Sequence, residues 1–321
     1  MTPNIISVGE LLVEIMRTDL NTPHGRTGAN YRGPYPSGAP AIFIDTASRM
    51  GRPFNLTTGF IGVVGNDEFG DCIINKLKND EVDVSQIKIL DSEVTGIAFN
   101  QYNSDGSRKF IFAAGAAGKL NPSQINDFYF KDIKCLHIMG SALSISNSSR
   151  KSCKKAIKIA KKKNPNVIIS FDPNLRPEML ELNTILKICK PVLETTDILL
   201  PSGEEAKTLA NIEDSTKACQ NLLDFGPKII VLKQGKEGCT IFTKENYDGI
   251  IVSGLKVDEI DPTGAGDSFG GAFLIGYLMG WDLKKIARFA NAVGALKVQS
   301  FGPMSSTSYD HVIEFVEKHH S

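Results

Sequence analysis

Residues 261–279, DPTGAGDSFGGAFLIGYLM, join a Gly-Ala-Gly turn to a carboxylate and then to an apolar run. Gly264, Ala265 and Gly266 leave almost no side chain between the backbone and a ligand, and glycine tolerates the dihedral angles that point several N–H groups one way. Residues 268–279 have the length and the apolar surface of a buried helix. The turn therefore stands at a helix N-terminus, where unpaired amides and the macrodipole favour an anion.

Asp267 is expected to stand beside this anion site. A bound polyphosphate would repel a carboxylate there, so the pattern indicates a proton acceptor next to a phosphoryl group in transfer. The alternative is an ordinary glycine-rich turn in which Asp267 caps the helix. The full D-P-T-G-A-G-D run followed by an apolar helix favours the first interpretation.

Residues 261–267 resemble the second signature of the ribokinase-like (PfkB) carbohydrate kinase family, and the resemblance continues over nearly the whole chain. It implies an α/β fold, namely a ribokinase-like three-layer α/β/α sandwich with a mainly parallel central sheet and a small β-sheet lid. The expected unit is a single kinase domain over residues 1–321, with the lid contributed by about 11–36 and 93–115. The activity implied is transfer of the γ-phosphate of ATP, with Mg²⁺, to a primary hydroxyl of a small sugar. Asp267 would be the base, and the backbone of Gly264, Ala265 and Gly266 would stabilise the developing charge.

The composition excludes several other classes of protein. The 321 residues are 41% hydrophobic and 22% charged, which suffices for one large domain with a full core. Lys+Arg and Asp+Glu number 36 each, which argues against a nucleic-acid or membrane-surface protein. The six cysteines are scattered without a C-x-x-C pair, and the chain has neither a signal-peptide pattern nor a membrane-spanning apolar run. We therefore expect a cytoplasmic protein with reduced thiols.

The order of predicted elements supports the same fold. From residue 135 onward strands and helices alternate, which indicates a parallel sheet covered by helices. Earlier, the alternating runs 94–102 and 108–112 flank a turn that contains Asp105 and Gly106, a strong hairpin signal. The polar, Gly- and Pro-rich residues 18–36 suit a loop or lid. A lid is physically reasonable because water must be kept from the γ-phosphate.

On the sugar side, the resemblance assigns hydroxyl contacts to Glu14 and a close backbone approach to the turn 37–41, which opens a helix. Without the resemblance, Glu14 would be an exposed strand carboxylate and the polar residues of FDPNLRP, 171–177, would cap a loop. That run follows a strand at the edge where parallel sheets bind ligands. Ile42 stands where the family usually carries Asn. The substrate-binding candidates are Glu14, Gly38, Ala39, Arg108, Asn174, Arg176 and Asp267.

On the nucleotide side, the family has an N-x-x-E element that governs Mg²⁺ and phosphate. Glu205 fits it while Ser202 replaces Asn, and a plain helix-start carboxylate is an equally open interpretation of Glu205. Asp261 is a candidate ligand of a monovalent cation such as K⁺. The nucleotide-binding candidates are Ser202, Glu205, Lys233, Gly235, Gly238, Gly264, Gly266 and Asn291. Asn291 could equally be a polar residue on a half-exposed helix.

The substrate is harder to predict. Residues 31–45 resemble kinases of tagatose or related ketohexoses, whereas the closely related 2-keto-3-deoxygluconate kinases place an Arg in the lid strand. The corresponding region here reads FAAG at 112–115, so a neutral ketohexose such as tagatose or fructose is preferred, because a buried carboxylate needs a cationic partner. Arg32, Arg108 or Arg176 could still supply that partner. The alternatives are a 2-keto-3-deoxygluconate kinase and a non-catalytic sugar- or nucleotide-binding relative. The resemblance also suggests a homodimer formed through the lid.

Overall fold

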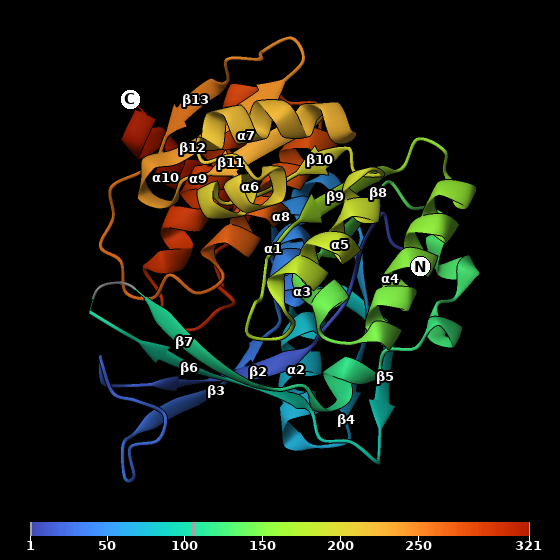
Figure 1. Ribbon diagram of the computed structural model, residues 1–321, viewed down its shortest axis with the longest axis vertical. Coiled ribbons are helices and arrows are strands. Elements are labelled where there is room, and N and C mark those ends of the chain that lie inside the picture. Colours follow the sequence, from blue (N-terminus) through green and yellow to red (C-terminus); the bar gives the residue numbers. More distant parts are fainter. Residues whose placement is uncertain (1, 105–106, 321) are drawn as a thin grey trace.

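The structure is a computed structural model that describes residues 2–104 and 107–320. The strands of the large sheet are β1 (Ile5–Val8), β4 (Thr58–Gly65), β5 (Val82–Leu90), β8 (Cys135–Met139), β9 (Ile168–Asp172), β10 (Ile198–Leu199), β11 (Ile229–Lys233), β12 (Gly238–Thr243) and β13 (Ile250–Ser253). They lie in the order β13-β12-β11-β10-β9-β8-β1-β4-β5 (Figure 1). The pairs β11–β12 and β12–β13 are antiparallel and the other pairs are parallel, so the sheet is mainly parallel.

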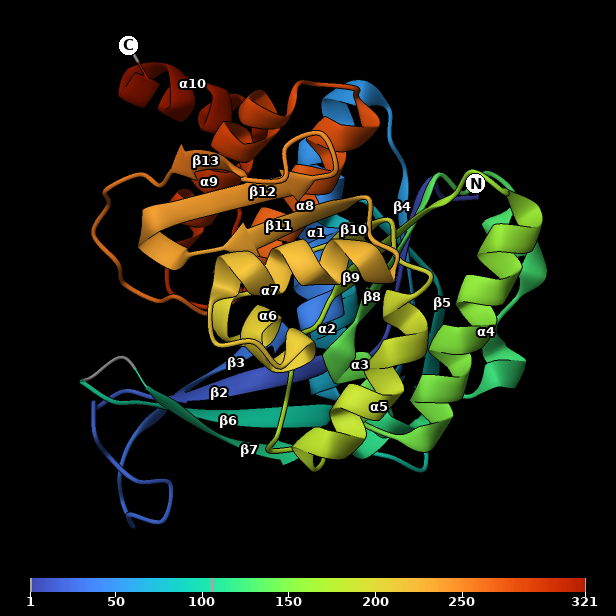
Figure 2. The same cartoon turned by 45° about the horizontal axis from the view of Figure 1, so that its top comes forward.

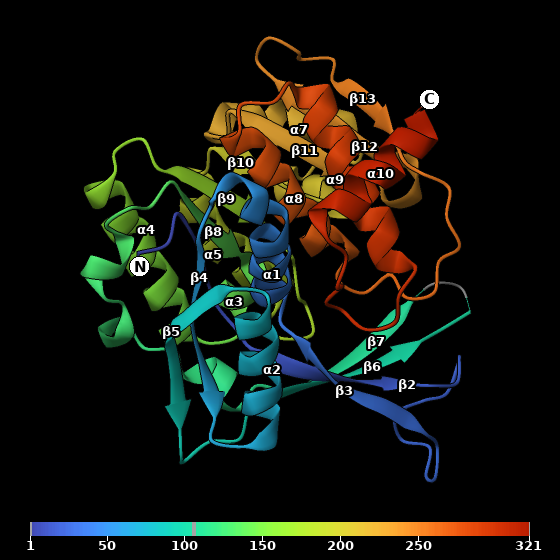
Figure 3. The same cartoon turned by 180° about the vertical axis from the view of Figure 1, so that it is seen from behind.

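The sheet is covered on both faces by helices. One face carries α3 (Gly140–Ser144), α4 (Asn147–Lys163), α5 (Leu182–Leu193), α6 (Gly203–Ala210) and α7 (Ser215–Leu222), all nearest the viewer in Figure 1. The opposite face carries α1 (Ala39–Gly51), α2 (Glu68–Asn79), α8 (Ala265–Leu278), α9 (Leu283–Val298) and α10 (Tyr309–His320), seen from behind in Figure 3. Strands buried on both sides read as near-continuous apolar runs, as β4 and β8 do. The predicted three-layer α/β/α fold is confirmed.

Helix α8 lies deep in one helical layer, packed between α1 and α9. Its residues from Ser268 to Gly276 are all buried, so this helix has no solvent-facing stripe. The prediction of a buried helix after the Gly-Ala-Gly turn is therefore confirmed, with its start at Ala265.

A smaller sheet projects from one edge of this body (Figure 2). Its strands are β2 (Leu12–Arg17), β3 (Tyr31–Ser37), β6 (Gly96–Tyr102) and β7 (Arg108–Ala113), in the order β3-β2-β6-β7. The pairs β2–β3 and β6–β7 are antiparallel, and β2–β6 is parallel. The predicted turn residues Asp105 and Gly106 lie outside the described residues.

The segment 18–36 was expected to be loop or lid, and its last part forms strand β3 of the small sheet, which ends at Ser37. Its prolines, Pro34 and Pro36, are tolerated because β3 is an edge strand, which needs backbone donors on one side only. The outer surface of this sheet exposes Ile111, at 52% of its area, and Val94 nearby is 65% exposed. Association of two copies through the lid would cover such side chains; that association stays a prediction.

The six cysteines are free, and all but Cys72 are buried. Within residues 2–104 and 107–320, no helix is both long and apolar enough to cross a membrane.

Candidate active site

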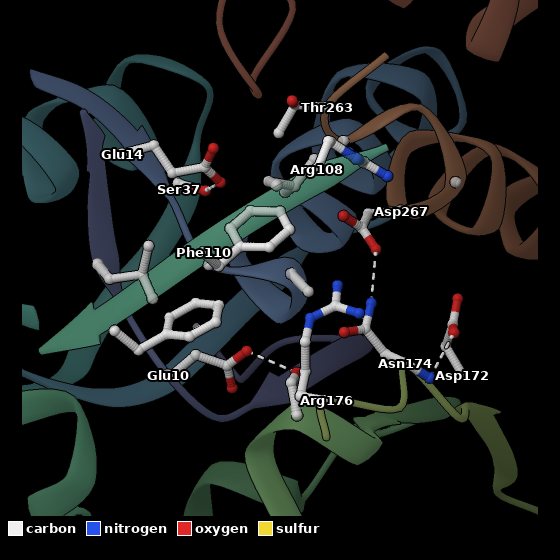
Figure 4. Close-up of a pocket in the computed structure, with 18 of the residues that line it drawn as sticks. Glu10, Glu14, Ser37, Arg108, Phe110, Asp172, Asn174, Arg176, Thr263 and Asp267 are labelled. Atoms are coloured by element: carbon white, nitrogen blue, oxygen red, sulfur yellow. Dashed lines mark hydrogen bonds between the residues drawn. The ribbon is translucent and has the colours of Figure 1, made fainter. Parts of the chain in front are cut away.

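A cavity of about 270 Å³ lies between the carboxyl ends of the parallel strands and the small sheet (Figure 4). It receives side chains from the lid strands, from the start of α1, from the loop after β9 and from the N-terminus of α8. Carboxyl ends of parallel strands are where open α/β sheets bind ligands. The predicted residues that line it are Glu14, Gly38, Ala39, Arg108, Asn174, Arg176, Ser202, Glu205, Lys233, Gly264, Gly266 and Asp267.

The anion site predicted from the Gly-Ala-Gly turn has the expected backbone. Gly264 precedes α8 in the left-handed conformation, with φ 79°, and a Cβ there would lie 2.3 Å from the carbonyl oxygen of Pro303. Only glycine accommodates both restraints. The amide of Ala265 donates to the carbonyl oxygen of Pro262 at 3.3 Å, and the first i→i−4 bond of α8 is donated by Ser268 to Gly264. The amides of Gly266 and Asp267 lie between these two donors, in the first turn, where helix amides have no i−4 partner.

Asp267 lies in that first turn and faces the cavity. The side-chain amide of Asn174 donates to its Oδ1 at 3.5 Å (Figure 4). Burial raises the pKa of Asp267 to about 6, against the attraction of Lys233 and Arg176. A carboxyl group with this pKa is mostly ionised at neutral pH and still basic enough to accept a proton.

Lys233 ends strand β11 close to the same helix start. Its Nζ forms an ion pair of 2.5 Å with Oδ2 of Asp172, the last residue of β9. A Cβ on Gly266 would lie 3.4 Å from this Nζ, so the ammonium lies beside the N-terminus of α8. Burial alone would lower the pKa of Lys233, but Asp172 and Glu205 raise it, which keeps the side chain charged. The cluster therefore places a fixed cation beside the predicted anion site.

Asp172 has the capping role that sequence reasoning considered, since its Oδ1 accepts from the amide of Asn174 at 3.1 Å. Its pairing with Lys233 was not predicted, because the two residues are distant in sequence and meet only through the order of the parallel strands.

Glu205 and Ser202 form a capping box at the start of α6. Oε2 of Glu205 accepts from the amide of Ser202 at 2.8 Å, and Oε1 accepts from the amide of Leu175 at 2.9 Å. Both carboxylate oxygens therefore have backbone donors, as expected for a helix-start carboxylate that also holds the 172–176 loop. Within the described residues, no group of three or more His, Cys, Asp or Glu side chains is placed to hold a metal ion.

The lid contributes a second group of polar side chains. Ser37 donates to Oε1 of Glu14 at 2.6 Å, while Oε2 is buried without a hydrogen-bond partner in the described part of the chain. Burial raises the pKa of Glu14. A buried carboxylate oxygen without a partner is suited to accept a hydroxyl from a ligand. Ile42, by contrast, adds an apolar surface to this wall of the cavity.

Strand β7 presents alternate residues to the cavity, namely Arg108, Phe110 and Phe112. The rings of Phe110 and Phe112 stack, with centroids 5.5 Å apart. Because side chains alternate along a strand, an arginine four residues before Phe112 shares its face. Residues 112–115 contain no arginine, and Arg108, which the sequence analysis kept as a candidate partner for a substrate carboxylate, lines the cavity.

Glu10 is a cavity residue that sequence reasoning missed. It follows β1 directly, its Oε1 accepts from Ser141 at 2.6 Å, and its Oε2 is buried without a partner among the described residues. Burial raises the pKa of Glu10 to about 7, and the Ser141 bond opposes that rise. Its position after the first strand was the available signal, but the sequence analysis assigned Glu10 no role.

The remaining predicted residues do not line this cavity. Ala265 is the first residue of α8. Asn291 donates to the carbonyl oxygens of Val252 and Ser253, so its side chain connects α9 to strand β13. Gly238 packs so closely on β13 that a Cβ would lie 2.2 Å from the oxygen of Val252. Gly235 lies in an open turn after Lys233, and Asp261 is buried behind the helix start.

The fold and this site define a phosphotransferase, and comparison with known proteins agrees. Residues 2–309 match the model of the pfkB family carbohydrate kinases, so the chain belongs to this family, as the sequence predicted. It is an ATP-binding phosphotransferase with an alcohol group as acceptor.

Three similar proteins illustrate the range of the family. A 5-dehydro-2-deoxygluconokinase of Clostridium perfringens is 30% identical, with 98% of this chain and 93% of that protein covered. A ribokinase II from E. coli, solved with ATP and Mg²⁺, is 38% identical, with a TM-score of 0.89 and coverage of 99% of this chain and 100% of that one. A fructokinase double mutant of Vibrio cholerae O395, solved with fructose, ADP and a potassium ion, is 26% identical, with a TM-score of 0.84 and 98% of both chains covered.

Proposed function

We propose that this kinase transfers the γ-phosphate of MgATP to a primary hydroxyl of a six-carbon keto-sugar acid, a compound of the type phosphorylated by 5-dehydro-2-deoxygluconokinases and 2-keto-3-deoxygluconate kinases. The observation that carries the proposal is the pair of arginines in the cavity, Arg108 and Arg176. Among the described residues, neither guanidinium lies within 4.0 Å of a carboxylate oxygen. Arginine is the residue best suited to bind a ligand carboxylate with two hydrogen bonds.

The two arginines reach the cavity from opposite walls. Arg108 comes from lid strand β7 and Arg176 from the loop after β9, whose backbone is held by Glu205. The preference for a neutral sugar rested on the lack of an arginine at residues 112–115, and it left Arg108 and Arg176 as possible partners; because both line the cavity, a substrate carboxylate would have cationic partners there. The partly unpaired carboxylates of Glu10 and Glu14 complete the site as acceptors for sugar hydroxyls.

In the proposed mechanism, Asp267 accepts the proton of the attacking hydroxyl, and the amides of Gly264, Gly266 and Asp267 stabilise the charge on the transferred phosphoryl group. Lys233, held by Asp172, adds a fixed positive charge beside the same turn. Mg²⁺ bound to ATP would supply a positive charge that neutralises part of the phosphate charge. Glu205 acts on this chemistry by positioning the 172–176 loop.

A neutral ketohexose is the second candidate, favoured by the number of hydroxyl acceptors and by the aromatic face of Phe110 and Phe112. In this case Arg108 would bind phosphate or a hydroxyl, and its removal would affect acid and neutral sugars alike.

The test is a comparison of 5-dehydro-2-deoxygluconate, 2-keto-3-deoxygluconate, fructose and tagatose as acceptors, by ADP release from MgATP. The native enzyme should turn over a keto-acid with the highest kcat/KM. Arg108→Met should raise the KM for that acid by about tenfold to a hundredfold, because it removes a charged hydrogen-bond partner.

Arg32→Met is the matched control. Arg32 is also a lid arginine, but it is exposed and lies over the ring of Phe301 instead of lining the cavity, so its loss should leave the KM nearly unchanged. Turnover of a ketohexose with no response to the acids would reject the keto-acid proposal and favour the second candidate.

A further inference from the structure

Lys297 is a fully buried lysine on α9, the helix beside α8 (Figure 3). Its Nζ donates to the carbonyl oxygen of Asp261 at 2.8 Å and to that of Ser300 at 3.3 Å, and it lies 3.9 Å from Oδ2 of Asp261. The ammonium is thus surrounded by two backbone carbonyl groups and a carboxylate. Such oxygen ligands are also those that replace the hydration shell of K⁺ in proteins.

A monovalent cation at Asp261, which the family resemblance suggested, does not fit these surroundings. Oδ1 of Asp261 already accepts from Tyr102 at 2.7 Å and from the amide of Thr263 at 3.0 Å. Oδ2 accepts from the amide of Gly302 at 2.8 Å. The remaining acceptor, the carbonyl oxygen, is bonded to Lys297, so an added cation would compete with a buried ammonium for the same oxygens.

We propose that the Lys297 ammonium is a built-in replacement for this monovalent cation, so that the kinase needs no added K⁺. The carboxylate of Asp261 is only 1% exposed and requires a positive partner, which Lys297 provides from within the chain. Although burial would raise the pKa of Asp261, Lys297 and the hydrogen bond from Thr263 hold it below its usual value. Asp261 therefore keeps its negative charge without a cation from the solvent.

Lys297 is a positioning residue, connected to the anion site by two turns. One turn runs from Asp261 to Gly264, at the start of α8. The other runs from Ser300 to Pro303, whose carbonyl oxygen limits the space beside Gly264. The ammonium bonds to the first residue of each turn, so it holds together the two segments that shape the phosphate-binding amides.

The proposal depends on the kinase family and not on the choice of sugar, and its first test needs no acceptor. The affinity for a non-hydrolysable MgATP analogue and the thermal midpoint of the native enzyme are measured in KCl and in choline chloride of equal ionic strength. Between the two salts, the affinity for the analogue should differ by no more than about twofold and the thermal midpoint by no more than about 1 °C. A fivefold or greater tightening of analogue binding by K⁺ would overturn the proposal.

The second test creates the missing cation site. Lys297→Ala leaves the carbonyl oxygens and the carboxylate around a void, so its analogue affinity in choline chloride should fall by about tenfold and be restored by K⁺ or NH₄⁺ but not by Li⁺. Lys297→Met fills the same volume without a charge and should lose affinity without rescue. Lys284→Ala, at an exposed lysine of the same helix, is the neutral control.

Cation-selective rescue of Lys297→Ala, without rescue of Lys297→Met, supports the proposal, since the loss of a purely structural lysine would not be reversed by K⁺ or NH₄⁺. Unchanged affinity in Lys297→Ala, or equal rescue by every salt, would overturn it. Should this variant fail to fold, the comparison of KCl with choline chloride on the native enzyme still decides the question. Failure of every sugar to react would reject the proposed function without altering these binding results.

Discussion

Replacing Asp267 with Asn separates the catalytic from the structural contribution of this carboxylate. The side chain keeps its size, and the amide oxygen can still accept from Asn174, which lies 3.5 Å away. Losing a general base typically slows a reaction by about a hundredfold to ten-thousandfold, or about 3 to 5 kcal/mol of barrier. We therefore expect kcat to fall in this range, with the MgATP analogue bound at least as tightly because a negative charge has been removed.

The same substitution should stabilise the fold at alkaline pH. Burial raises the pKa of Asp267 from 3.8 to about 6, which corresponds to a cost of about 3 kcal/mol for keeping the group ionised in the folded chain. Because the higher pKa belongs to the folded state, the cost is absent below pH 3.8 and complete above about pH 6. The thermal midpoint of Asp267→Asn should thus exceed that of the native enzyme by about 5 °C at pH 8, with a smaller difference at pH 5.

The assays are steady-state ADP release, calorimetric titration with the analogue, and thermal melting at pH 5 and 8. Asp282→Asn is the control, since Asp282 caps α9 outside the cavity and Asn is an equally good cap. A kcat within tenfold of the native value would refute the proton-accepting role. A midpoint that falls at pH 8 would refute the electrostatic part of the reasoning.

Two further predictions concern the same site. The kcat of the native enzyme should rise about tenfold per pH unit below an apparent pKa near 6 and level off above about pH 7, because Asp267 must be ionised to accept a proton; a flat profile between pH 5 and 7 would contradict this. Glu205→Gln should lower the thermal midpoint by a few °C, because one of two backbone hydrogen bonds is lost, and should change the Mg²⁺ concentration for half-maximal activity by less than about threefold; a tenfold rise in that concentration would show instead that Glu205 serves the metal.

The parts of the fold that sequence could predict are those with strong local patterns. The Gly-Ala-Gly turn followed by an apolar run located α8, and the alternation of strands and helices indicated the parallel sheet. Strand β5 (Val82–Leu90) has no such pattern, because it lies at the edge of the large sheet and mixes Asp83, Ser85 and Lys88 among its apolar residues. Strand β3 also lies at the edge of a sheet, and its prolines conceal the strand pattern. Edge strands tolerate residues that central strands exclude.

The candidate site was predictable where a motif named its residues and unpredictable where tertiary contacts join them. Asp267 and Gly264 belong to a single motif, whereas the pairing of Lys233 with Asp172 depends on the strand order of the sheet. Lys297 is the clearest example of a residue whose surroundings the sequence does not predict. A lysine near the end of an amphipathic helix is normally solvated, and nothing local reveals that this side chain turns inward.

Alternate residues of strand β7 belong to two different surfaces, the lining of the cavity and the exterior of the small sheet. Residues 108, 110 and 112 look into the cavity, while the exposed Lys109 and Ile111 look outward. Substitutions at these three positions could therefore change the acceptor preference. They would alter neither the outer surface of the small sheet nor the N-terminus of α8. Lid and helix would then diverge at independent rates, which would account for close sequence relatives that phosphorylate sugars as different as an acid and a neutral ketose.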